Sequence, residues 1–347
     1  MPPSGGSTLV RTTLVAALAA CCAAAGVVNE QSGDAIRQAI DAGYRQQYDS
    51  AQSFIESVLA RDSTDPAGPF WQASFIQTLL YDSGERGLVD SFYSVTKQAE
   101  ELCRQRLSRD ERNARAHFYL GMTRLNLANC QSWEQKKSAA LRTMLGVQGE
   151  MRAALKLDPE LTDACFGLGM VEYFRAQGNK FVLGLGLFGS KGKAYDWLRK
   201  AEQGSGLLST SATSSLAWIM GQDRKFDSAI ARCEQLLARY PGNRTVMRMM
   251  RDIYYSKGDY VKALALGARL EKSIRASFAD NKYGLSENWI VSAKCWEGLS
   301  QTDSACALAE RVMDWEEHQD DVPWLPNYVR DARALLDRHP KMRGGGK

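Results

Sequence analysis

The sequence predicts an all-α fold in which antiparallel helix pairs stack into a solenoid with irregular insertions. Alanine recurs in the same helical context at Ala194, Ala229 and Ala263, with spacings of 35 and then 34 residues. Pro159 and Pro241 follow two of the helical stretches, where a proline stops one helix before the next begins. A period of this length marks one supersecondary unit. Because each helix pair leaves an apolar face bare, neighbouring pairs must stack to bury it.

The N-terminal 25 residues differ from the rest and are expected to be an export signal. Arg11 is their only charged residue, and an apolar run from Leu14 to Ala20 follows it. This run is too short to cross a bilayer but fits the core of a signal peptide. Leu18-Ala19-Ala20-Cys21 resembles the bacterial lipobox, which implies that Cys21 becomes lipidated. Cleavage at Ala23 to Ala25 with free secretion, or an uncleaved segment, are the alternatives.

The predicted helices then follow in order. Tyr48-Asp-Ser-Ala51 opens a helix of the same kind as those at the three alanines, and Thr302-Asp-Ser-Ala305 opens a later one. The stretch from Pro66 to about Asn113 is helical in period but poor in the repeated motif. Leu120-Gly121 and Leu168-Gly169 lie on first helices of pairs. We expect these glycines where two helices approach too closely for a large side chain.

These positions together resemble the tetratricopeptide repeat, a helix pair of about 34 residues. Tyr254, Gly258, Tyr260 and Ala263 match its Y…G-x-Y-x-x-A portion, and the Leu-Gly pairs and the two prolines also match. The resemblance covers roughly residues 32 to 320. It implies a right-handed superhelical solenoid whose inner helices line a concave groove, and it implies protein or peptide partners.

The chain departs from the regular repeat at two insertions. Gly121 and the matching Val147 are separated by 14 residues more than in the family's repeat, and Gly169 and Ala194 by 13 more. We therefore expect three regions: a signal region at 1–25, a repeat domain at 26–322 with an inserted apolar loop at about 178–192, and a C-terminal capping helix with a basic tail at 323–347.

The second insertion contains Phe181-Val-Leu-Gly-Leu-Gly-Leu-Phe-Gly, which fits the G-x-G-x-x-G pattern. A dinucleotide fingerprint needs a strand before the glycines, whereas a repeat helix precedes them here. A P-loop fails because Ser190 stands where lysine is required. No nucleotide and no other cofactor is therefore expected. The segment packs on its own chain, contacts a partner or touches a membrane, and its candidate contact residues are Phe181, Leu185, Leu187 and Phe188.

The register of the repeat gives candidate partner-binding positions on the inner helices. Aromatic residues and methionine are enriched at protein interfaces, and methionine adapts to varied partners. The alternative is that irregular curvature closes the groove and makes these residues core. The ten candidates are Phe118, Met122, Leu125, Phe166, Met170, Tyr173, Trp218, Arg248, Asp252 and Tyr255.

Other chemistry finds little support in the sequence. The net charge of +4 over 347 residues, without a broad basic stripe, argues against nucleic acid. The cysteines after the signal region show no metal spacing, and Cys295 with Cys306 is the one disulfide worth testing. Trp289 and Trp296 share a helix face and could stack on a sugar, but their register favours core packing. The acidic run from Glu316 to Asp321 lacks a calcium-loop pattern and favours a solvated helix end, so no metal is expected.

The resulting hypothesis is a non-enzymatic scaffold of the cell envelope that binds a protein or peptide through its concave face and its apolar insertion. A ligand-binding lipoprotein for glycan or peptide uptake is the alternative, and an enzyme is the weakest reading. We expect export and a lipid anchor in the outer membrane facing the periplasm, with a soluble periplasmic or secreted protein as the alternative. The lipid would be its only link to the membrane.

Overall fold

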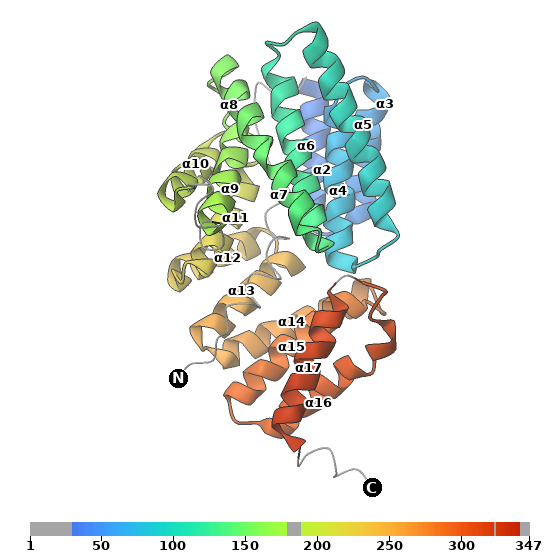
Figure 1. Ribbon diagram of the computed structural model, residues 1–347, viewed down its shortest axis with the longest axis vertical. Helices are drawn as coiled ribbons and strands as arrows, with labels where there is room; N and C mark the ends of the chain where they lie inside the picture. Colours follow the sequence, from blue (N-terminus) through green and yellow to red (C-terminus); the bar gives the residue numbers. More distant parts are fainter. Residues whose placement is uncertain (1–29, 179–188, 323, 341–347) are drawn as a thin grey trace. The chain divides into compact units, whose positions relative to one another are not determined.

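The computed structural model describes residues 30–178, 189–322 and 324–340, and each regular element among them is a helix (Figure 1). This confirms the all-α fold class. In chain order the elements are α2 (Glu30–Tyr44), α3 (Tyr48–Arg61), α4 (Ala67–Ser83), α5 (Leu88–Arg109), α6 (Ala114–Trp133), α7 (Lys137–Leu145), α8 (Val147–Leu157), α9 (Asp163–Gly178), α10 (Lys191–Gln203), α11 (Ser209–Gln222), α12 (Phe226–Arg239), α13 (Arg244–Lys257), α14 (Tyr260–Ser277), α15 (Lys282–Gly298), α16 (Thr302–Met313), the short 3-10 helix η1 (Glu316–His318) and α17 (Leu325–Arg338).

The repeated alanines occupy the positions that the period predicts. All five are fully buried, on α3, α10, α12, α14 and α16: Ala51, Ala194, Ala229, Ala263 and Ala305. The pairs α2–α3, α6–α8, α9–α10, α13–α14 and α15–α16 pack together. A methyl group at these positions lets two helices approach closely, and a larger side chain would separate them.

The glycines of the Leu-Gly motif mark the close approach within a pair. A Cβ atom added at Gly169 would lie 2.6 Å from Cγ of Leu198 and 3.1 Å from the carbonyl oxygen of Ala194. One added at Gly121 would lie 2.1 Å from Cε of Met151 and 3.5 Å from the carbonyl oxygen of Val147. The matched positions of the repeat therefore do meet in space, despite the residues inserted between them.

Helix ends are set by local side chains. Asn113, Asn243 and Asn281 accept hydrogen bonds from backbone N–H groups in the first turns of α6, α13 and α15, at 2.9, 2.9 and 2.7 Å. Asparagine is a favoured N-cap because its side chain satisfies one of the orphan donors there. Gly258, with φ of +86°, ends α13 in the left-handed conformation.

The first insertion forms a helix of its own. It folds as α7, which packs on α6, while α6 and α8 still pack directly against each other. The second insertion falls largely outside the described residues, and so do the candidate contacts Phe181, Leu185, Leu187 and Phe188, together with Cys21.

The chain forms two compact units. Among the described residues, the N-terminal unit comprises 30–78 and 88–216, and the C-terminal unit comprises 79–87 and 217–340. In the C-terminal unit α17 packs on α15 and α16. No helix in the described part of the chain is long and apolar enough to span a bilayer.

Candidate functional site

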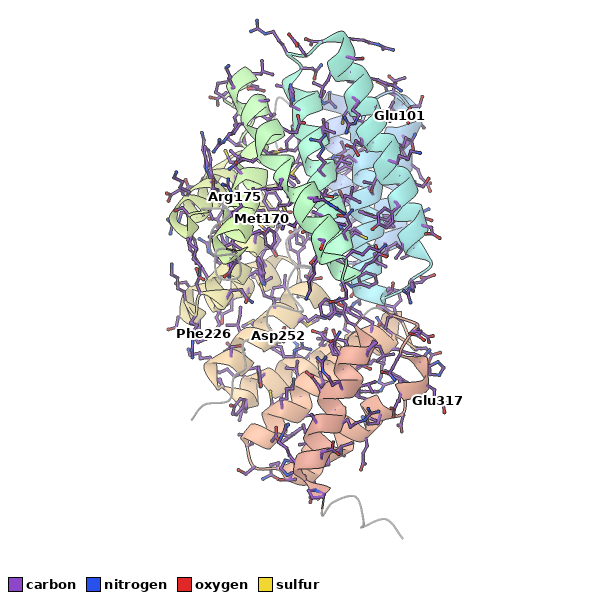
Figure 2. All side chains as sticks on the ribbon, viewed as in Figure 1. Glu101, Met170, Arg175, Phe226, Asp252 and Glu317 are labelled. Carbon is purple, nitrogen blue, oxygen red and sulfur yellow. The ribbon has the colours of Figure 1, made fainter. Side chains whose placement is uncertain are left out.

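The structure buries nine of the ten predicted groove residues. In the N-terminal unit Phe118, Met122, Leu125, Phe166, Met170 and Tyr173 are each at most 1% exposed. Figure 2 shows Met170 among closely packed side chains. In the C-terminal unit Trp218, Arg248 and Asp252 are buried, and only Tyr255 is partly exposed. This burial agrees with the alternative in which irregular stacking makes these residues core. Their role in partner binding stays a prediction.

Arg248 and Asp252 belong to a buried cluster of charges in the C-terminal unit. It contains three guanidinium groups (Arg244, Arg248 and Arg251) and three carboxylates (Asp82, Asp252 and Glu287), all of them buried. The formal charges balance. Such a cluster is tolerated in a core only if its members pair, because an isolated buried charge is very costly.

Arg251 lies at the centre of these contacts. Its Nη2 donates to Oδ1 of Asp252 and to Oε1 of Glu287, each at 2.7 Å. Its Nη1 donates to Oδ1 of Asn288 at 2.9 Å. Burial alone would lower the pKa of Arg251, but the attraction of Asp252 and Glu287 outweighs it and raises the pKa. Arg251 is therefore fixed in its charged form.

The remaining members of the cluster are less completely paired. Nε of Arg248 lies 2.7 Å from Oε2 of Glu287, an ion pair whose alignment makes no hydrogen bond. Nη1 and Nη2 of Arg248 and Oδ2 of Asp252 have no hydrogen-bond partner among the described residues. Burial raises the pKa of Asp252 to about 6, although Arg251 opposes this shift. The cluster links α13 to α15 inside the core.

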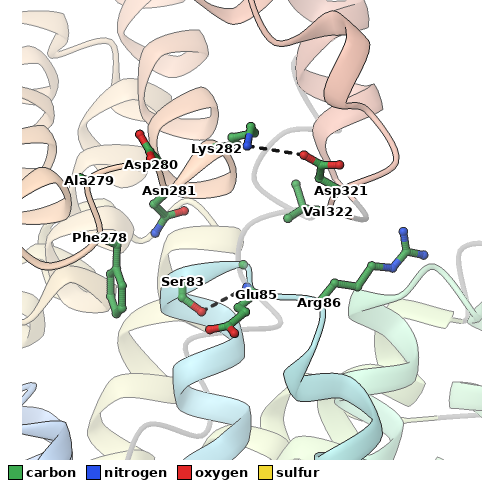
Figure 3. Close-up of a pocket in the computed structure, with 11 residues that line it drawn as sticks. Ser83, Glu85, Arg86, Phe278, Ala279, Asp280, Asn281, Lys282, Asp321 and Val322 are labelled. Atoms are coloured by element: carbon green, nitrogen blue, oxygen red, sulfur yellow. Dashed lines mark hydrogen bonds and ion pairs between the residues drawn. The ribbon is translucent and has the colours of Figure 1, made fainter.

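An open pocket of about 310 Å³ lies in the same unit (Figure 3). Three turns line it: residues 83–86 after α4, 278–282 between α14 and α15, and 321–322 after η1. No sequence pattern predicted this site, because its first turn is about 200 residues from the second and turn residues carry no periodicity. The only local signal is the Asp82-Ser-Gly84 sequence, which favours a turn.

Tight backbone contacts hold the first two turns together. Gly84 has φ of +72°, and a Cβ atom there would lie 2.3 Å from Cβ of Tyr283. Nδ2 of Asn281 donates to the carbonyl oxygen of Asp82 at 2.6 Å, while its Oδ1 caps α15. Behind the pocket, Nε of Arg244 donates to both carboxylate oxygens of Asp82 at 2.9 Å. The pocket is thus built on a rigid, buried support.

The pocket wall carries charges of both signs. Nζ of Lys282 lies 3.5 Å from Oδ2 of Asp321, and Arg86 donates to the carbonyl oxygen of Asp320. Glu85 and Asp280 are exposed, and Phe278 supplies an aromatic ring. These groups can form hydrogen bonds and ion pairs with a polar segment that enters the pocket. Among the residues with described placement, no three histidine, cysteine or acidic side chains gather as metal ligands.

Of the two tryptophans that share a helix face, Trp289 packs in the core. This side chain is 4% exposed, and its ring stacks on Trp315 with the centroids 5.0 Å apart. The guanidinium carbons of Arg275 and Arg311 lie 5.4 and 5.7 Å from its ring centroid. Trp296 is only partly buried. A shared flat platform for a sugar is therefore not formed.

The cysteines of the described chain are all buried and free. Cys295 and Cys306, the pair that the sequence marked as worth testing, are not bonded to each other. Burial raises the pKa of Cys295 to about 12, and it also raises the pKa of Cys306. These thiols behave as small apolar groups of the core.

No protein-family model matches the chain, and a search of curated proteins finds no relative. Solved structures do show likeness. The chain is similar to pilF of Pseudomonas aeruginosa, with 17% identity over 74% of this chain and 93% of pilF and a TM-score of 0.41. It is similar to a tetratricopeptide repeat protein of Parabacteroides merdae, with 11% identity, coverage of 88% and 100%, and a TM-score of 0.41. It is also similar to yeast Tom70, with 12% identity, coverage of 96% and 71%, and a TM-score of 0.48.

Proposed function

We propose that this chain is a non-enzymatic scaffold that binds a protein or peptide partner. The observation that carries the proposal is the open pocket of the C-terminal unit, whose three turns present charges of both signs beside an aromatic ring. Such a wall suits recognition of a polar segment of another chain, because interface rims combine hydrogen bonds with exposed charges. Loops held by a rigid helical frame are also where binding residues concentrate.

One residue of the predicted groove, Tyr255, is accessible enough to take part in the proposed binding. Tyr255 is the groove position that is already partly exposed, and its ring lies 6.0 Å from that of Tyr260. A partner reaches Tyr255 without any rearrangement of the core. The nine buried groove residues act in binding only if the stacking opens, so Tyr255 is the position that tests the groove directly.

The experiment is photo-crosslinking in the native host from three single positions. A photoreactive residue replaces Glu85 at the pocket, Tyr255 at the groove, or Lys272, an exposed position on α14 that serves as the control. The proposal expects one reproducible protein partner from Glu85 or Tyr255 and none from Lys272. The crosslink from Glu85 should be lost when Asp280→Lys reverses a charge inside the pocket.

Two results would contradict the proposal. One is equal capture from all three positions, which indicates chance encounter. The other is no reproducible partner from Glu85 or Tyr255 in a folded protein. That second result favours the ligand-binding alternative, which predicts a rise in melting temperature with a glycan or a short peptide because selective binding to the folded state stabilises it.

We also propose that the chain is exported and lipid-anchored at Cys21. The support is the lipobox-like Leu18-Ala19-Ala20-Cys21 after an apolar run. Labelled palmitate should enter the wild-type protein in its host and should be absent from Cys21→Ala. Label that survives this substitution would remove the basis for the anchor, while the scaffold proposal would stand.

A further inference from the structure

The inserted helix α7 carries an exposed apolar pair. Leu141 and Leu145 are 51% and 55% exposed, and they share one face because they are four residues apart on a helix. The opposite face holds Ala140, which is buried against the rest of the unit, and Thr143 Oγ1 donates to Gln131 of α6 at 2.9 Å. Val261 is the other exposed large apolar residue in the described chain, and it stands apart on α14.

Uncompensated positive charge surrounds this pair. Lys137 and Arg142 are exposed, and their side chains form no ion pair with any residue of known placement. The sequence holds no acidic residue between Glu134 and Glu150. Both of these carboxylates are engaged, Glu134 with Tyr93 and Lys136, and Glu150 with His117 and Arg124. The surface of α7 is therefore basic and apolar together.

A polar network connects the residues that follow α7 to α9 and to the start of α10. Gln148, at the start of α8, donates to Oε1 of Glu172 at 3.0 Å and accepts from Nη1 of Arg175 at 2.8 Å, both on α9. Glu172 in turn accepts from the backbone N–H of Ser190 at 3.2 Å. The start of α10, with exposed Lys193, is thereby linked through Glu172 to the start of α8.

We propose that the exposed face of α7 binds the surface of an anionic lipid bilayer. Exposed leucines flanked by unpaired lysine and arginine match the chemistry of helices that lie in the headgroup region. A protein partner fits less well, because the face lacks the tryptophan and tyrosine anchors that dominate protein interfaces. The helix is extra to the α6–α8 pair, so it presents this face without weakening the core. The inference goes beyond the scaffold function and does not depend on it. It adds a second membrane contact to the lipid anchor, which the sequence alone led us to expect as the only one.

Co-sedimentation with vesicles tests the proposal on the full chain carrying Cys21→Ala, so that no lipid can be attached. The protein should sediment with vesicles of phosphatidylcholine and phosphatidylglycerol but not with phosphatidylcholine alone. Added salt should weaken binding, because it screens exposed charges. Lys137→Glu with Arg142→Glu should lower the affinity at least about 25-fold, since each cation near an anionic surface contributes about 5-fold. Leu141→Ser with Leu145→Ser should also release the protein.

Matched control variants test whether vesicle binding depends on α7 itself or only on the charge and apolar surface of the whole protein. Arg269→Glu with Lys272→Glu makes the same charge change on exposed positions of α14, and Val261→Ser removes an apolar residue that is 66% exposed. Both controls should bind like the parent, and circular dichroism should show every variant folded. The proposal is overturned if the parent shows no preference for phosphatidylglycerol. It is equally overturned if the α7 variants bind like the parent, since another part of the chain then holds the lipid.

Discussion

Asp163 shows at the scale of one residue how a buried charge joins two helices. It begins α9 and is 1% exposed, and its carboxylate accepts backbone hydrogen bonds from Leu207 and Leu208 at 2.8 and 2.7 Å. Leu207 and Leu208 directly precede α11, so a side chain of α9 holds the turn that leads into α11. Gly206 permits this, because a Cβ atom there would lie 2.0 Å from Oδ1 of Asp163.

The pKa of Asp163 predicts a pH dependence of stability. Burial raises this pKa from 3.8 to about 6, against the lowering effect of the two backbone hydrogen bonds. The folded state therefore binds the proton more tightly than the unfolded state does. The resulting stabilisation, roughly 3 kcal/mol at most, is present below pH 4 and is lost as the pH rises through 6. Wild type should exceed Asp163→Asn in unfolding free energy by more at pH 4 than at pH 7, as measured by urea denaturation. An equal difference at both pH values would contradict this assignment.

The buried pair of Asp82 and Arg244 gives the second prediction at this scale. Removing either partner alone, by Asp82→Leu or Arg244→Met, should destabilise the protein by about 3–5 kcal/mol, because the other charge is left buried and unpaired. The double variant should cost much less than the sum of the two. A double-mutant cycle in urea measures this coupling. The exposed pair Lys257–Asp227, at 2.5 Å, is the control and should couple by about 1 kcal/mol or less. Additive effects at Asp82 and Arg244 would argue against the buried ion pair.

At the scale of elements, the motif glycines decide how closely two helices approach. Gly169→Ala should destabilise the protein by about 1–3 kcal/mol, because the new methyl group meets Leu198 and the backbone of Ala194. Gly149→Ala, in α8, is the matched control, since no heavy atom lies within 4 Å of its added Cβ. That change should be neutral or stabilise by up to about 1 kcal/mol. Thermal denaturation compares the two, and equal effects would show that close approach does not restrict Gly169.

The elements that the sequence predicted are those fixed by small residues at a regular period. Ala194 and Gly169 could be paired in advance because only small side chains fit where two helices touch. The stretch from Pro66 to Asn113 lacked the motif because it forms α4 and the 22-residue α5, which is longer than the repeat's helices. The length of the first insertion was visible, but not its fold as α7. Arg248 and Asp252 were placed in a groove by register. In the structure Arg248 pairs with Glu287 on α15 and Asp252 pairs with its neighbour Arg251, and both are held in the core. Such pairing leaves no trace in a single sequence.

For the whole molecule, the division into two units can be followed through the buried thiols. Cys103, Cys130 and Cys165 lie in the N-terminal unit, and Cys233, Cys295 and Cys306 lie in the C-terminal unit. Burial raises the pKa of Cys103 and of Cys233 to about 12, so the reactive thiolate is scarce as well as shielded. Each thiol therefore reports the opening of its own surroundings.

Pulsed alkylation across a urea series should exploit this division. In a chain carrying Cys21→Ala and Cys22→Ala, the six thiols should resist labelling in native buffer, while Lys272→Cys, at an exposed position of α14, should react at once. With rising urea, the three thiols of each unit should become reactive together, because a compact unit opens cooperatively. Peptide mass spectrometry assigns each label. Thiols of one unit that react at clearly different urea concentrations would show that the helix pairs open one by one, as in a regular repeat array whose stability is a sum over neighbours.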